Sequence, residues 1–447
     1  FFQAEDGIRD RSPSRGLGDV YKRQEEFQGA TDYAGLGLKL APLDIDHLSW
    51  PSGAVEPKAV ADLIGPGGSE YVEEFLRNTV LPKADADRAR EELGLSRPYT
   101  DSRLSVRQYR VTLYKELFKR QMVEWALEDG TRVGLFGVWK SDGKRVRLIV
   151  DARLSNCDFS VPETALLPSS AAFSRMNVEP CENLFLSSAD LKDAFYTMEL
   201  PEPLRKNFTL EPISAGHLGL SQLNGQVLKP DTLIFPRFRV IPMGFSHAVN
   251  LCQHVVRSLC KRAGYGEHMQ VVEGRPVPPL NEGAVVAYVD NMVVASTSRE
   301  RSIRVMEDIV RTCKGAGLIV HEETYGATDR ETLGWAFSSA NQTFRPKARR
   351  LWRLDGAISF ALAKGTCSGR QMSRLVGHFV SMALLRRECL CPLPAAVRYI
   401  HKHEFDSSSL WPSVRRELRW MQSVLPLLVH KVGRPISERV VAVFASP

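Results

Sequence analysis

Two short apolar runs, each of which meets an aspartate, most constrain how this 447-residue chain can fold. The run in Glu182–Leu200 leads into Asp190, and the stretch AYVDNMVVAS (Ala287–Ser296) places Asp290 between two apolar runs. Such runs, bounded by turn residues, predict buried strands. A carboxylate beside a core is costly without a partner or a metal ion, so both aspartates are candidate site residues.

Each motif alone also has a simpler interpretation. Asp190 can act as an N-cap before LKDAFY. Asp290 and Asn291 can form a hairpin turn, because Asp and Asn tolerate left-handed backbone geometry. The amide of Asn291 cannot carry charge, so the loop is a metal site with one altered position, a decayed site or only a tight turn.

The order of elements predicts an α+β fold. After the first run, a Pro-Met-Gly turn opens a helix with apolar residues Val249, Cys252, Val256 and Leu259 at helical spacing. A second amphipathic helix spans roughly Arg299–Lys314, and the strands LIVHEE and TLGWAF follow. This order resembles a split βαβ sheet covered by helices on one face. Upstream, we expect a helix over Arg107–Glu128 and a hairpin at KSDGK.

Composition excludes several classes of protein. The chain is 43% hydrophobic and 25% charged, as in ordinary soluble proteins. Its eight cysteines are scattered, which argues against a zinc site or a disulfide framework and fits a reducing compartment. Neither a membrane span nor a secretory signal is visible. We therefore expect an intracellular protein, in the cytoplasm or nucleus, that does not bind membranes.

Charge is distributed unevenly along the chain. Residues 342–447 contain 18 Lys and Arg against six Asp and Glu, whereas the rest is slightly acidic. Such a basic segment can follow nucleic-acid phosphates, or it can be a set of solvated helix faces.

Both ends look artificial. Residues 1–24 resemble a translated sequencing adapter and are excluded from fold reasoning. The last residues, VVAVFASP, stop inside an expected strand, so we interpret the sequence as a fragment of a longer reading frame.

Six motifs in one consistent order, over about residues 105–400, resemble those of reverse transcriptases. SSADLKDAFYTMEL resembles the motif that carries the first metal-binding Asp, and AYVDNMVVAS resembles the Tyr-x-Asp-Asp hairpin. IPMGFSHAVNLCQHV is similar to the motif beneath template and nucleotide. WKSDGKRVRLIVDARLSN resembles the fingers, GAGLIVHEET the motif after the hairpin, and LGWAF the primer grip.

The resemblance implies a right-hand polymerase fold with fingers, a palm built on a ferredoxin-like split βαβ sheet, and a helical thumb. The expected boundaries are fingers at 101–185, palm at 186–338 with an inserted fingers segment at about 205–238, thumb at 339–400, and connection at 401–447. The connection would include the truncated start of a possible RNase H domain. Residues 25–100 form an N-terminal region whose role we cannot interpret.

The resemblance also implies roles for individual residues. Asp190 and Asp290 would be catalytic and bind two Mg²⁺ ions, with Mn²⁺ as an alternative, and Leu191 (through its carbonyl) and Asn291 would complete the metal site. Phe195 falls at the steric gate that would collide with a ribose 2′-hydroxyl. The remaining nucleotide-binding candidates are Lys140, Arg147, Asp193, Ala194, Met243 and Gly244. The primer or template candidates are Tyr288, Gln253, Leu333, Gly334 and Trp335.

Two single-residue departures from the family pattern matter. Asn291 replaces the usual second Asp of the hairpin. Thr324 stands where the motif after the hairpin usually carries Lys, a candidate general acid, although Lys314 or a neighbour could serve instead.

The tail, SGRQMSRLVGHFVSMALLRRECLCPLPAAVRYI, resembles LTR-type, gypsy-like and especially tyrosine-recombinase (DIRS-like) retrotransposons. The implied activity is template-directed addition of deoxynucleotides to a primer 3′ end, with an RNA or DNA template, a primer and deoxynucleoside triphosphates as partners. The alternatives are a decayed transposon remnant that only binds nucleic acid, and an RNA-dependent RNA polymerase. Phe195 argues against the last, because such enzymes must admit the 2′-hydroxyl.

Overall fold

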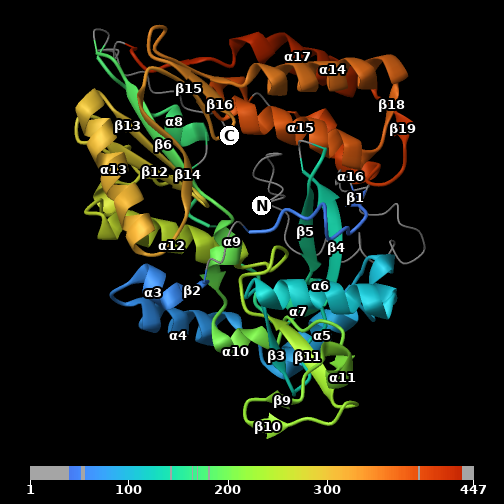
Figure 1. Ribbon diagram of the computed structural model, residues 1–447. Coiled ribbons are helices and arrows are strands. Elements are labelled where there is room, and N and C mark those ends of the chain that lie inside the picture. Colours follow the sequence, from blue (N-terminus) through green and yellow to red (C-terminus); the bar gives the residue numbers. More distant parts are fainter. Residues whose placement is uncertain are drawn as a thin grey trace.

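The computed structural model describes residues 40–51, 56–140, 143–163, 165–168, 170–179, 182–390 and 393–434 (Figure 1). Three features discussed above lie outside these residues: the adapter-like segment 1–24, the tip of the KSDGK hairpin at 141–142, and the final expected strand. None of the helices in the described ranges has the length and apolar character needed to cross a lipid bilayer.

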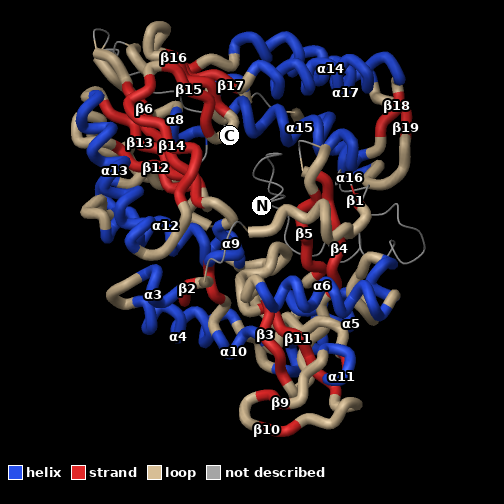
Figure 2. Tube along the Cα trace, in the orientation of Figure 1, coloured by secondary structure: helices blue, strands red, loops and turns tan. Residues whose placement is uncertain are grey.

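A four-stranded antiparallel sheet, here called the central sheet, positions the two candidate aspartates. Its strand order is β12 (Ala284–Tyr288), β13 (Asn291–Ser296), β6 (Phe185–Leu191) and β14 (Val320–Ala327). Helices α12 (Ala248–Arg262) and α13 (Arg299–Gly315) pack on one face of the sheet (Figures 1 and 2). The predicted split βαβ arrangement is therefore confirmed.

The strands of the central sheet are apolar without alternation because both faces are buried. In β13, Met292 and Val294 belong to the core that contains α12 and α13, whereas Val293 and Ala295 belong to a second core shared with C-terminal helices. All four side chains are fully buried. A strand covered on both faces needs apolar residues at successive positions, which explains the continuous run after Asn291.

The N-terminal region is built into the rest of the molecule. Strand β1 (Leu40–Ala41) pairs with β4 (Gly134–Trp139), which forms a hairpin with β5 (Val146–Asp151). Strand β2 (Lys58–Ala59) pairs in parallel with β7 (Met198–Glu199), and the Tyr71 ring stacks on His254 of α12 at 3.8 Å between centroids. These residues complete the fold, although the sequence alone assigned them no role.

One predicted helix is shorter than expected. The structure has α6 at Arg107–Lys119 and a strand, β3, at Val123–Ala126, where we expected the helix to continue to Glu128. Gln121 takes a left-handed conformation (φ 56°), which ends the helix. Val123 and Trp125 are buried while Glu124 and Ala126 are partly exposed, so this segment follows strand periodicity and pairs with β11 (Leu233–Phe238).

The other described helices and strands before residue 270 have five residues or fewer, except α4 and α5. The helices are α3 (Val60–Ile64), α4 (Gly68–Thr79), α5 (Lys83–Leu93), α7 (Arg153–Asn156), α8 (Ser170–Phe173), α9 (Ala194–Thr197), α10 (Glu202–Arg205) and α11 (Ala215–Leu218). The strands are β8 (Ile213–Ser214), which pairs with β11, and the small hairpin β9 (Gln222–Leu223) and β10 (Gln226–Val227).

A C-terminal unit of helices and a small antiparallel sheet follows the central sheet (Figure 1). The sheet contains β15 (Asp329–Thr332), β16 (Trp335–Ser338), β17 (Thr343–Pro346) and β20 (His430–Lys431). The helices are α14 (Ala348–Lys364), α15 (Gly369–Ala383), α16 (Pro394–Lys402) and α17 (Pro412–Val424), and β18 (Thr366–Cys367) pairs with β19 (Ser408–Ser409). A capping box of Ser368 and Gln371 starts α15, and one side of this helix is buried (Met372, Leu375, Phe379, Met382).

Candidate functional site

The two candidate aspartates lie side by side at one end of the central sheet. Asp190 is the penultimate residue of β6, and its Cα partner on β13 is Asn291. The backbone N–H of Leu191 donates to the carbonyl of Asp290 at 2.8 Å, which fixes the hairpin tip against the end of β6.

The thiol of Cys252 lies within electrostatic reach of both aspartates. Cys252 is fully buried in α12. Burial, followed by the negative charges of Asp290 and Asp190, raises the pKa of this thiol well above its usual range. Both carboxylates therefore lie close to the same buried atom.

The hairpin turns one residue earlier than the sequence suggested. Val289 and Asp290 form the turn, Tyr288 pairs with Asn291, and the left-handed residue is Val289 (φ 56°) rather than Asp290 or Asn291. A β-branched residue rarely adopts this conformation, because its side chain crowds the backbone. The expectation that Asn291 serves the turn was therefore wrong, since Asn291 is the first residue of β13.

The side chain of Gln253 binds the backbone of this strained turn. Its Oε1 accepts a hydrogen bond from the Val289 N–H at 2.7 Å, and its Nε2 donates to the carbonyls of Ala287 at 2.9 Å and Leu166 at 3.2 Å. The side chain is only 3% exposed. The structure thus places Gln253 under the hairpin, where it contacts the protein backbone rather than forming an open surface for primer or template.

We expect Gln253→Leu to lower both thermal stability and any activity of the site. The substitution leaves the buried Val289 N–H and the Ala287 carbonyl without this partner, at a cost of about 1–3 kcal/mol for each unsatisfied group. Thermal unfolding and primer-extension rates would measure the effect. Asn250→Leu is the control, because Asn250 on the same helix makes one side-chain bond, to the Glu163 carbonyl. Equal behaviour of the two variants would contradict a special role for Gln253.

Asn291 interacts directly with its neighbour. Its amide Nδ2 donates to Asp290 Oδ1 at 3.0 Å. An aspartate at this position has no hydrogen to donate and would bring a third negative charge to the end of the sheet. Asn291 therefore lowers the electrostatic cost of holding Asp190 and Asp290 together.

His321 lies beside Asp190, although the sequence did not indicate it as a candidate site residue. It is the Cα partner of Asp190 on β14, and its Nε2 lies 3.5 Å from Asp190 Oδ2. Thr324 pairs instead with Ser188, farther from the end of the sheet, and Lys314 forms an ion pair with Glu323 at 2.6 Å. Only the register of β14, which shifts between His321 and Thr324, reveals which side chain faces the carboxylate.

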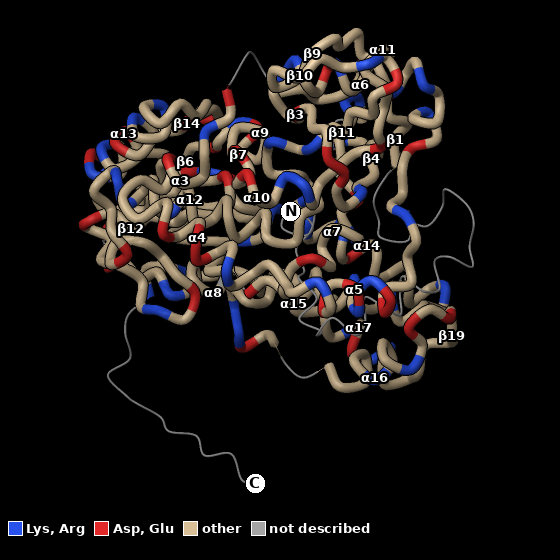
Figure 3. Tube along the Cα trace, turned by 90° about the horizontal axis from the view of Figure 1, so that it is seen from below, with Lys and Arg blue, Asp and Glu red and all other residues tan. Residues whose placement is uncertain are grey.

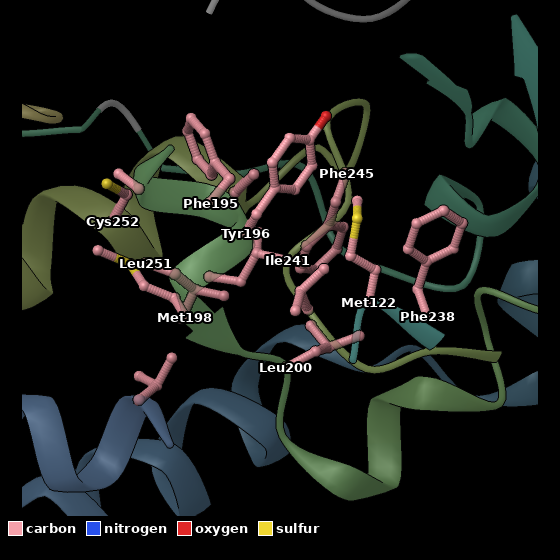
Figure 4. Close-up of a cluster of buried hydrophobic side chains, with 14 of the residues drawn as sticks. Met122, Phe195, Tyr196, Met198, Leu200, Phe238, Ile241, Phe245, Leu251 and Cys252 are labelled. Atoms are coloured by element: carbon pink, nitrogen blue, oxygen red, sulfur yellow. The ribbon is translucent and has the colours of Figure 1, made fainter. Parts of the chain in front are cut away.

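A second group of candidates surrounds Tyr196 beyond the end of β6. Asp193 is left-handed (φ 53°) and turns the chain into α9, whose residues Ala194 and Phe195 are each 3% exposed. Figure 4 shows Phe195 and Tyr196 pointing to the side opposite Met198, and α9 packs on α12. Burial raises the pKa of the Tyr196 phenol, while Arg147 opposes and Asp193 adds to this shift, so both charges lie near the ring.

The Pro242–Met243–Gly244 turn packs against β5. The carbonyl of Met243 accepts the N–H of Val150 at 2.9 Å, and Tyr196 donates from its hydroxyl to the carbonyl of Leu148 at 3.2 Å. Gly244 has φ 140°, and a Cβ on it would lie 2.0 Å from the Val150 carbonyl oxygen. Only glycine fits, and the contact joins this turn to the strand that carries Arg147.

The remaining candidates lie in two other places. Lys140 ends the described part of the β4 side of the hairpin, where its Nζ donates to Ser49 Oγ at 2.6 Å. Leu333 and Gly334 form the turn between β15 and β16, and Trp335 is 5% exposed in the C-terminal core. Tyr288, by contrast, is partly exposed beside the Val289–Asp290 turn.

The central sheet with its paired aspartates, the β4–β5 hairpin and the C-terminal helices define the mixed α+β polymerase fold of reverse transcriptases. Residues 128–331 match the family described as reverse transcriptase (RNA-dependent DNA polymerase), so the chain contains a reverse transcriptase domain. None of the curated proteins matches this chain.

Two solved structures are similar to this chain. A foamy viral protease-reverse transcriptase (dRH) in complex with double-stranded DNA is similar with a TM-score of 0.50 and 13% identity, covering 86% of this chain and 63% of that one. A foamy viral protease-reverse transcriptase in complex with double-stranded DNA matches with a TM-score of 0.49 and 13% identity, covering 94% and 72%. This chain thus spans less than two thirds of the first protein.

Proposed function

We propose that this chain is a retroelement RNA-directed DNA polymerase that adds deoxynucleotides to a primer 3′ end. The observation that carries the proposal is the pairing of Asp190 with the hairpin that bears Asp290, at one end of the central sheet. Two carboxylates at one end of a sheet, one near the end of a strand and one in the adjacent hairpin turn, are an arrangement suited to nucleotidyl transfer with metal ions.

The donor set at this end of the sheet fits Mg²⁺. Asp190, Asp290 and the carbonyl of Leu191 offer oxygen atoms, which Mg²⁺ prefers, and a small number of protein ligands leaves room for water and triphosphate oxygens. When bound, two such ions would activate the primer hydroxyl and stabilise charge on the phosphates. Mn²⁺ is an alternative ion for the same oxygen ligands.

Other residues would hold the nucleotide and exclude the wrong sugar. Arg147 and Lys140 suit phosphate oxygens, because Arg offers a bidentate fork and Lys a compact charge. Gly244 lets the turn pack directly on the backbone of β5, which holds the turn beside the strand that carries Arg147. The aromatic ring of Phe195, beside the Asp193 turn, would bar a ribose 2′-hydroxyl.

We assign residues 101–185 and the inserted segment at about 205–238 to the fingers, the central sheet with α12 and α13 to the palm, and α14–α16 to the thumb, with α17 in the connection. Residues 342–434 carry 17 Lys and Arg against five Asp and Glu, and Figure 3 marks these charges along the chain. This excess suits contact with a duplex backbone without sequence readout. Duplex DNA, as in the foamy viral complexes, and an RNA/DNA hybrid are the expected partners.

Primer extension tests the proposal. The purified chain, with a DNA primer on an RNA template and Mg²⁺, should incorporate deoxynucleotides in template order and reject ribonucleotides. A preference for ribonucleotides would indicate an RNA-dependent RNA polymerase. Primer–template binding with no incorporation would favour the second candidate, a remnant that only binds nucleic acid, which Asn291 supports as a departure from the family hairpin.

We expect Asn291→Asp to keep incorporation and to reduce the Mg²⁺ concentration needed for half-maximal rate. The added carboxylate attracts cations, but without metal it replaces the amide that donates to Asp290 and so should lower thermal stability. Rates across a Mg²⁺ titration, and melting temperatures with and without Mg²⁺, would measure both effects. Complete loss of activity would mean that this hairpin works differently from that of the family.

A further inference from the structure

The turn between β15 and β16 is held by the start of the next helix. Leu333 and Gly334 are both left-handed (φ 48° and 82°), and the Gly334 carbonyl accepts the N–H of Lys347 at 3.2 Å. Lys347 is the N-cap of α14, and its ammonium lies 3.6 Å from Glu331. The turn therefore depends on where α14 begins.

Arg350, in the first turn of α14, touches three elements at once. A Cβ built on Gly334 would lie 2.7 Å from Arg350 Nη1, so the guanidinium lies directly against the turn. The guanidinium carbon is 5.9 Å from the centre of the Trp335 ring on β16, and Nη2 donates to Ser381 Oγ on α15 at 3.4 Å. Figure 1 places β16, α14 and α15 together in this part of the molecule.

The chemistry of arginine suits this junction better than that of lysine. A planar guanidinium can lie over an aromatic ring while its separate N–H groups contact different partners, whereas an ammonium is a single point of charge. Arg349, the preceding residue on α14, is exposed to solvent. The helix thus presents two neighbouring arginines in different surroundings.

We propose that Arg350 is a positioning residue that couples the β15–β16 turn to α15, so that the turn and the C-terminal helices hold the primer end as one unit. This inference rests on the proposed function, in which Leu333–Trp335 contacts the primer. Arg350 acts through the turn and does not touch the reacting atoms. Losing it should misplace the primer end, and small misplacements of a reacting group cost up to about 100-fold in rate.

The test compares Arg350→Met and Arg350→Lys with Arg349→Met as the matched control. Each protein is assayed for the KM of primer–template, the KM of deoxynucleotide, kcat and product length in a single binding event. We expect both Arg350 variants to raise the primer–template KM about tenfold and to shorten products, with the nucleotide KM unchanged. Arg349→Met removes one charge from the same basic segment without touching the junction, so any rise in its primer–template KM should be far smaller, and its product length should stay that of the wild type.

The outcomes separate the possible roles. A purely structural role would lower the melting temperature and the active fraction without changing either KM, and it would overturn the inference. Full rescue by Arg350→Lys would also overturn it, because charge alone would then suffice. Ser381→Ala should give a smaller change in the same direction and add nothing to Arg350→Met, as expected for directly interacting residues. A wild-type chain that extends no primer would overturn the proposed function and this inference together.

Discussion

Asp190→Asn and Asp290→Asn should each reduce nucleotide incorporation more than about 100-fold, since loss of groups that merely support metal ligands already costs ~10–100-fold. Each substitution keeps the shape of the side chain and removes one of the two carboxylates that meet at the end of the central sheet. Single-nucleotide incorporation into a labelled primer at saturating Mg²⁺ would measure the loss.

The same variants should fold normally. Removing one of two neighbouring negative charges relieves repulsion, so the melting temperature without Mg²⁺ should stay the same or rise. Primer–template binding should persist, which distinguishes a chemical defect from unfolding. Asp231→Asn, at an exposed position remote from the sheet, is the control and should retain full activity. Incorporation that survives in either site variant would refute the assignment of that aspartate.

The order and type of the main elements were predictable because they depend on patterns within short segments. The apolar runs around Asp190 and Asp290 and the stripes of the helices α12 and α13 have the periods of buried strands and amphipathic helices. Their order then leaves few sheet topologies open. The adjacency of the two aspartates follows from that topology.

Features that depend on distant contacts were not predictable in this way. The left-handed Val289 contradicts local preference and persists because Gln253, 36 residues earlier, binds its N–H. His321 faces Asp190 only because β14 shifts register, which no spacing rule reveals. The segment Val123–Ala126 is a strand because β11 supplies its partner, more than 100 residues later.

Gly244→Ala should cause the second-largest loss of activity. An added Cβ would lie 2.0 Å from the Val150 carbonyl oxygen, and φ 140° is itself unfavourable for alanine. Because the backbone fixes the position of the Cβ and the Val150 oxygen is itself a backbone atom, no rotamer change can relieve the clash, and the turn must move away from β5. We expect a higher KM for the deoxynucleotide, a lower kcat, and a loss of stability of at least about 1–3 kcal/mol from backbone strain.

Gly264→Ala distinguishes the loss of stability caused by backbone strain from the effect of the clash with Val150. Gly264 also has a positive φ (99°), but a Cβ there meets nothing within 4 Å. It should therefore lose stability through strain while keeping the nucleotide KM of the wild type. If Gly244→Ala changed only stability, to the same extent as Gly264→Ala, the turn would not be part of the nucleotide site. A raised nucleotide KM in Gly244→Ala alone would instead connect the contact between Gly244 and Val150 to nucleotide binding, because that contact joins the turn to the strand of Arg147.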